Sequence, residues 1–110
     1  MTDQGKKLLS DILSAIILIE EFTDDINSFD AYTNDAKTQS AVERQLSIIG
    51  EAVNSYDKLE NIDSLEKSRK IVGFGNRLIH AYDSIDNSIV WVIIIRYLND
   101  LKIEVQHKLK

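Results

Sequence analysis

The sequence predicts an all-α protein, an up-and-down bundle of four to five helices in a single domain covering residues 1–110. Three observations predict this class. Proline is absent and only four glycines occur, so few residues interrupt helices. Apolar residues recur three and four positions apart over long stretches, the period of a helix with one buried face. No stretch has the clear alternation of a β-strand. Short connections between helices favour antiparallel neighbours.

Composition excludes several classes of protein. The chain is 44% apolar and 28% charged, which is ordinary for a globular protein. It has no cysteine, which excludes disulfides, thiolate chemistry and cysteine-based zinc sites. The longest apolar run, residues 89–95, is too short to span a bilayer, and residues 1–7 lack the layout of a signal peptide. We therefore expect a cytoplasmic location and no membrane association.

The first half of the chain predicts three helices. Thr2 or Asp3 is the expected N-cap of the first, which should end near residues 22–25. Ser28 predicts one short helical turn over residues 29–32, and Asn34 or Asp35 the start of a long third helix. The apolar residues of the first helix are Leu9, Ile12, Leu13, Ile16 and Ile19. Those of the third are Val42, Leu46, Ile49, Val53 and Tyr56.

A loop over residues 58–63 should precede a fourth helix, for which Asp63 or Ser64 is the expected N-cap. Gly73 within it suggests close packing against another helix. The residues expected to point inward are Leu65, Ile71, Phe74, Leu78 and Ile79. Residues 83–87 read as a turn. The last helix should run from about Asp86 to the C-terminus. Its inward residues are predicted to be Val90, Ile94, Tyr97, Leu98, Leu101 and Val105.

Residues 89–95 are seven consecutive apolar residues, which cover every face of about two helical turns. A helix that is apolar all round must be buried all round. Either this helix is central in the bundle, or it forms a homodimer seam through the C-terminal helices, with Trp91 among the anchors. We favour the seam.

Charge is distributed unevenly. The net charge is −5, yet residues 1–63 hold 5 Lys and Arg against 13 Asp and Glu, whereas residues 64–110 hold 8 against 5. Lys67, Arg69 and Lys70 cluster in the second half, just before Arg77. The cluster is either a solvated helix face or a local surface that binds phosphate or RNA.

The stretch of residues 76–82 sets polar groups into an apolar helical pattern. On a helix Asn76 lies about 40° from His80, and Arg77 lies about 60° to its other side. One face can thus present an amide, a guanidinium and an imidazole, which suits a phosphodiester because Arg binds phosphate oxygens and His moves a proton. No metal or cofactor is expected, and His107 lies in an amphipathic tail where a surface role is expected.

These residues resemble the HepT-like group of the HEPN superfamily. Residues 43–52 (ERQLSIIGEA) resemble the long-helix signature of that group. Residues 71–74 then lead into NRLIHAY at 76–82, and residues 86–91 resemble the entry into the final helix. The resemblance extends over essentially the whole chain.

The resemblance implies a homodimeric, metal-independent RNA endonuclease, the toxin of a type VII toxin–antitoxin pair with a minimal nucleotidyltransferase antitoxin. It implies that the ribose 2′-hydroxyl attacks the adjacent phosphate, with His80 as acid and base. It also implies that the partner nucleotidylates Tyr82 and thereby blocks the RNA-binding site.

One position departs from the family. Its motif has an arginine separated from the histidine by four to six intervening residues, positions that here are Gly75, Phe74 and Gly73; the closest match falls on Gly75. Three explanations remain open: a degenerate member that binds without cleaving, use of Arg77 or the basic cluster instead, or an inactivating Arg-to-Gly change in this chain. The alternative functions are a catalytically inactive dimer that binds a nucleotidyltransferase partner or a nucleotide, and a plain structural module.

Overall fold

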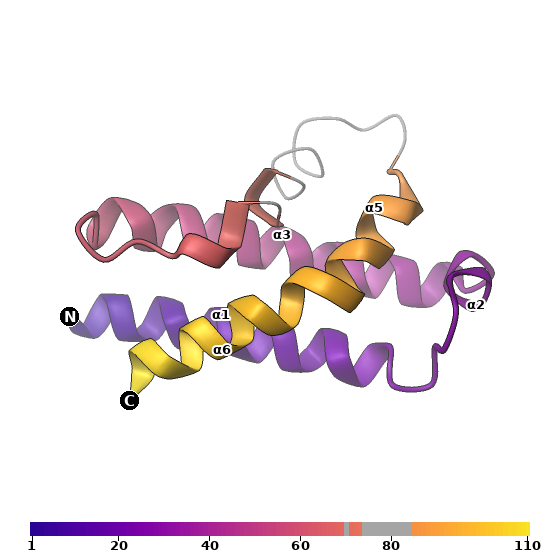
Figure 1. Cartoon of the computed structure of the whole chain (residues 1–110), viewed down its shortest axis with the longest axis horizontal. Coiled ribbons are helices and arrows are strands. Elements are labelled where there is room, and N and C mark those ends of the chain that lie inside the picture. Colours follow the sequence, from indigo (N-terminus) through magenta and orange to yellow (C-terminus); the bar gives the residue numbers. More distant parts are fainter. Residues whose placement is uncertain (70, 74–84) are drawn as a thin grey trace.

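The computed structural model describes residues 1–69, 71–73 and 85–110, and these are helical or irregular with no strand, which confirms the all-α class. Figure 1 shows α1 (Asp3–Phe22) antiparallel to α3 (Ala36–Leu59), with the short α2 (Phe29–Thr33) between them in sequence. The C-terminal helical segment lies across both and returns to the end of the bundle where α1 begins, so the two termini lie at the same end.

The first three helices begin where the sequence predicts. The N-caps are Thr2, Ser28 and Asp35, and each side chain accepts a hydrogen bond from the backbone amide three residues on, at 3.0, 3.1 and 3.0 Å. Each cap satisfies one of the amides that the first helical turn leaves without a partner. The long helix α3 continues to Leu59, two residues further than expected.

The core lies between α1 and α3 and is closed by the C-terminal helix. All five residues of the predicted α3 stripe are fully buried, and Leu9, Ile12, Ile16 and Ile19 of α1 face them. Leu13 is only partly buried. An ion pair of 2.9 Å between Lys102 and Glu20 joins the C-terminal helix to α1.

The last helix is interrupted by a π-helical segment. It consists of α5 (Asn87–Val92), the π segment η2 (Ile93–Tyr97) and α6 (Leu98–Leu109). The Leu98 amide bonds to the Ile93 carbonyl five residues earlier, which inserts one residue into the helical repeat. Val90 is buried as predicted, but the predicted stripe is wrong within the π segment, where Ile93 is buried in place of Ile94, which is half-buried like Tyr97. After it, Leu98, Leu101 and Val105 are buried as predicted.

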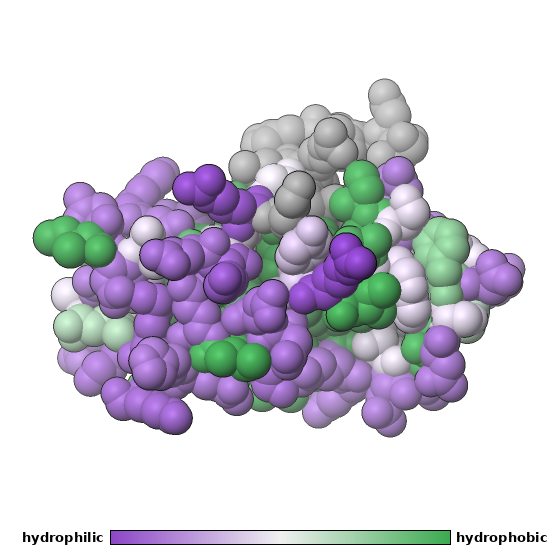
Figure 2. Space-filling view, viewed as in Figure 1, coloured by the Kyte–Doolittle hydropathy of each residue, from purple (hydrophilic) through white to green (hydrophobic). Residues whose placement is uncertain are grey.

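The apolar run of residues 89–95 is only partly buried within one chain. Val92 is 38% exposed and Ile95 is 58% exposed, so the helix is not enclosed within one chain. The less favoured alternative, a central position, is therefore wrong, and the favoured seam stays a prediction. Figure 2 shows apolar side chains gathered over α5 and the adjoining turn. Trp91 is half-buried and packs against Tyr32 of α2, with ring centroids 5.8 Å apart.

The π segment makes a testable difference to the core. Ile93→Ala should lower the free energy of unfolding by about 2–4 kcal/mol, because it leaves a cavity at a buried site. Ile94→Ala should cost clearly less, because that side chain is half-exposed. Urea denaturation of both variants measures the difference, and a larger loss for Ile94→Ala would contradict the π-helical register.

Candidate functional site

Most residues predicted for the site lie outside the described residues. These are Lys70, Gly75, Asn76, Arg77, His80 and Tyr82. Phe74, Leu78 and Ile79, predicted to point inward, lie outside them as well. Lys67 and Arg69 are described, and they belong to the segment that leads into the motif. For the site, the structure therefore shows how the backbone of this preceding segment is fixed.

The segment begins with η1 (Glu66–Ser68), a short 3-10 helix held by a carboxylate of α6. Oε2 of Glu104 accepts a hydrogen bond from the Glu66 amide at 2.9 Å, and Oε1 accepts one from the Lys67 amide at 2.9 Å. One side chain thus satisfies two amides at the start of the segment, which an ordinary N-cap residue would not reach together.

A second carboxylate holds the preceding amide. Oδ1 of Asp57, on α3, accepts from the Leu65 amide at 2.9 Å. The predicted N-caps, Asp63 and Ser64, were wrong: η1 starts after Leu65, which has no side-chain cap, because α3 and α6 supply the acceptors. We call Asp57 and Glu104, with the three amides they hold, the carboxylate clamp.

Asp63 has another role. It forms an ion pair of 2.6 Å with Lys108 in the last turn of α6. The hydrogen bond from Lys108 lowers the pKa of the Asp63 carboxyl. Burial by itself would lower the pKa of Lys108, but the hydrogen bond and charge of Asp63 outweigh it and raise that pKa. This pair is a further tie between α6 and the loop before η1.

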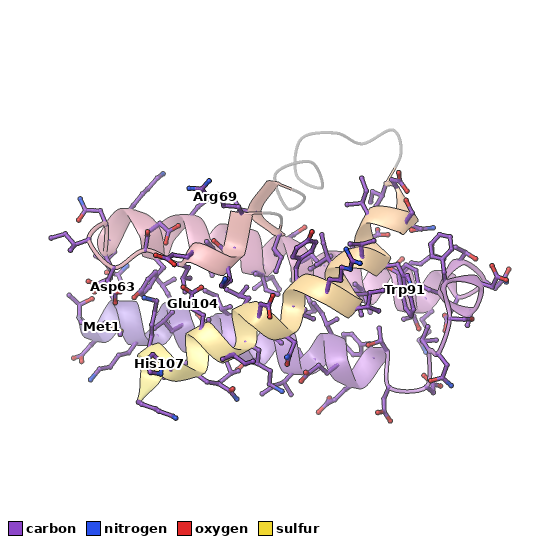
Figure 3. The ribbon with its side chains drawn as sticks, in the orientation of Figure 1. Met1, Asp63, Arg69, Trp91, Glu104 and His107 are labelled. Atoms are coloured by element: carbon purple, nitrogen blue, oxygen red, sulfur yellow. The ribbon has the colours of Figure 1, made fainter. Side chains whose placement is uncertain are left out.

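The two described residues of the predicted basic cluster are exposed. Lys67 and Arg69 are exposed, and neither side chain is hydrogen-bonded or ion-paired to another described residue. Figure 3 shows Arg69 on the side of the segment away from Glu104. Glu104 holds the Lys67 amide, and the side chains of Lys67 and Arg69 have no partner among the described residues, an arrangement that suits a phosphate group.

A hollow of about 750 Å³ lies between α3 and this segment. Its lining residues are Asn54, Asp57, Ser64, Leu65, Glu66, Ser68, Arg69, Val72 and Gly73. Gly73 is exposed, and a Cβ added there would meet no atom within 4 Å. The prediction that Gly73 allows close helix packing is therefore wrong, since open space adjoins it.

The sequence carried a signal for one wall of this hollow. Beside the apolar stripe of α3 runs a second stripe with the same spacing but polar or small residues: Glu43, Ser47, Gly50, Asn54 and Asp57. Asn54 and Asp57 line the hollow, and partial burial raises the pKa of Glu43 near the other end. Glu104 had no comparable signal, because its partners lie 37 and 38 residues away.

Other chemistry finds no support within residues 1–69, 71–73 and 85–110. No group of His, Cys, Asp and Glu side chains there is placed to hold a metal ion. In the same part of the chain, no helix is long and apolar enough to cross a bilayer. His107 is exposed, which agrees with the predicted surface role, and lies beside a shallow hollow lined also by Lys67 and Glu104.

The described residues form a small all-α domain, and the exposed side chains of Lys67 and Arg69 give its surface a basic patch that suits a phosphate group. Residues 12–107 match the family described as "Ribonuclease HepT-like". The chain belongs to this HepT-like ribonuclease family, within the HEPN superfamily, as the motif residues imply.

Individual relatives agree over nearly their whole length. The chain is 39% identical over 103 residues to a "Probable ribonuclease HepT" from Thermococcus cleftensis, covering 93% of each chain. Two Methanocaldococcus jannaschii proteins, provisionally named as RNases, are 37% and 36% identical. The matches cover 88% and 92% of this chain and 81% and 93% of those relatives. No solved structure matches significantly.

Proposed function

We propose that this chain, as a single domain of residues 1–110, is a HEPN-type RNA endonuclease toxin of a type VII toxin–antitoxin pair. Its substrate is RNA, its location is the cytoplasm, and cleavage is independent of metal. Because Gly75 stands where the family has the motif arginine, activity in this chain is weak or absent.

The observation that carries the proposal is the family match over residues 12–107, which includes the whole motif. His80 moves the proton as the ribose 2′-oxygen attacks the adjacent phosphorus and the bond to the next 5′-oxygen breaks. Asn76 and Arg77, which helical spacing in the sequence would place on either side of His80, contact the phosphate oxygens. Lys67, Arg69 and Lys70 attract the RNA backbone, and this role is supported by the side chains of Lys67 and Arg69, which are exposed and have no partner among the described residues.

We propose further that two copies pair through their C-terminal helices. Val92 and Ile95 support this pairing, because both are apolar side chains that are exposed within one chain. A second copy could cover them. The proposed antitoxin is a minimal nucleotidyltransferase that modifies Tyr82, two residues after His80. The alternative is a catalytically inactive dimer that binds the same partner or a nucleotide, and Gly75 favours it.

The cleavage proposal is tested with this chain, its Gly75→Arg variant and the Gly75→Arg, His80→Ala double variant, incubated with single-stranded RNA and a chelator. We expect Gly75→Arg to raise the cleavage rate by about 10²–10³-fold, because a fixed cation stabilises charge that develops in the transition state. The double variant should be inactive.

The outcomes separate the explanations for Gly75. Equal cleavage by this chain and Gly75→Arg would mean that Arg77 or the basic cluster substitutes for the missing side chain. No cleavage by any variant would contradict the nuclease proposal and favour the binding dimer. An arginine codon at position 75 in the source genome would identify the glycine as an inactivating change.

The dimer is tested with Ile95→Asp and light scattering at micromolar concentration. We expect this chain to have the mass of two copies and the variant the mass of one, because the variant introduces a charge into an apolar seam. Ile62→Asp is the matched control, since Ile62 is 100% exposed in the loop after α3. A mass of one chain for the unaltered protein, or an unchanged dimer with Ile95→Asp, would contradict the seam.

A further inference from the structure

We propose that the hollow between α3 and residues 64–69 and 71–73 is a subsite for one ribonucleotide unit, with its base against Asn54 and its phosphate against Arg69. The assignment of that nucleotide to an RNA chain rests on the proposed function. The same chemistry is also present in a free nucleoside monophosphate.

The size and shape of the hollow fit such a ligand. Its volume of about 750 Å³ lies within the range of clefts that bind small molecules. One wall is helix α3, which contributes Asn54 and Asp57, and the other is the segment that carries Arg69. A nucleotide can therefore contact both walls at once.

Four polar side chains that line the hollow lack partners among the described residues, and all four residues are exposed. They are the Asn54 amide, the Ser64 hydroxyl, the Glu66 carboxylate and the Arg69 guanidinium; the carboxylate would repel a phosphate, so the phosphate is placed against Arg69. A side-chain amide offers a donor beside an acceptor, the pattern that the edges of unpaired bases also present. The guanidinium offers the fork of donors that a phosphate accepts.

Two other polar side chains of the hollow, those of Asp57 and Ser68, already hold its walls. Asp57 accepts from the Leu65 amide, and the Ser68 hydroxyl donates to the Leu65 carbonyl at 2.9 Å. Glu104 fixes the next two amides from the α6 side. The walls are thus ordered before a ligand arrives, which reduces the ordering cost of binding.

Gly73 provides a way to fill the hollow without breaking the fold. It lines the hollow and is α-helical, and an added Cβ would meet no atom within 4 Å. Gly73→Leu therefore adds bulk into open space, whereas Gly73→Ala adds a single methyl group and leaves most of the volume.

The test measures binding and not cleavage, so it can be carried out with this chain although the motif arginine is missing. A fluorescently labelled short single-stranded RNA and, separately, adenosine 5′-monophosphate are titrated with this chain, Asn54→Ala and Gly73→Leu. We expect each substitution to weaken the binding of both probes about five- to tenfold, through a lost base contact or through steric filling. Circular dichroism shows whether each variant is folded. If Gly73→Leu does not fold, the test rests on Asn54→Ala, which changes an exposed residue of helix α3.

Two matched controls should bind like the unaltered chain. Gln45→Ala removes an amide from α3 on the side that faces α1, where a separate groove lies. Gly73→Ala changes the same residue without filling the space.

The outcomes separate the subsite from the proposed function. RNA binding that is unchanged in both test variants would overturn the subsite while the proposed function stands. Binding of the monophosphate alone, weakened by both variants, would support a nucleotide site and count against RNA as the substrate. Binding of neither probe to the unaltered chain would overturn both.

Discussion

Two carboxylates that hold three consecutive backbone amides determine where the segment that leads into the predicted motif starts. Asp57 of α3 accepts from Leu65, and Glu104 of α6 accepts from the next two residues. A 3-10 helix of three residues has little stability by itself, since it forms few internal hydrogen bonds. Its amides would otherwise depend on water. The carboxylate clamp therefore fixes the backbone at residues 65–67, and the side chains of Lys67 and Arg69 have no partner among the residues that the structure describes.

The carboxylate clamp and the proposed dimer seam both involve the C-terminal helical segment. Helix α6 carries Glu104 and Lys108, which hold the segment before the motif, and it continues from the π segment that exposes Ile95. A partner seated on that face would bind the same continuous helix that holds the basic segment. In the π segment Ile93 is buried and Ile95 is exposed, and the helix continues into α6 without ending. Short insertions of this kind are frequent at functional sites.

Local patterns predicted most of the fold, because they are encoded within a few residues. The three N-caps and the α3 stripe needed only the helical period and the preference of Ser, Thr and Asp for caps. Contacts between distant segments could not be predicted in the same way. The sequence pointed to Asp63 as a cap, but Glu104 arrives from 37 and 38 residues away. The π segment was missed because seven apolar residues satisfy more than one register. The family was predicted from residues 43–52, 71–74 and 86–91 together with the motif at 76–82, and the motif itself lies outside the described residues.

Amide hydrogen exchange, followed by NMR at single residues, tests the clamp most directly. In the unaltered chain the amides of Leu65, Glu66 and Lys67 should exchange more slowly than free amides, because each donates to a carboxylate. Glu104→Ala should speed exchange at Glu66 and Lys67 and leave Leu65 protected through Asp57. Slow exchange at all three amides in Glu104→Ala would contradict the account.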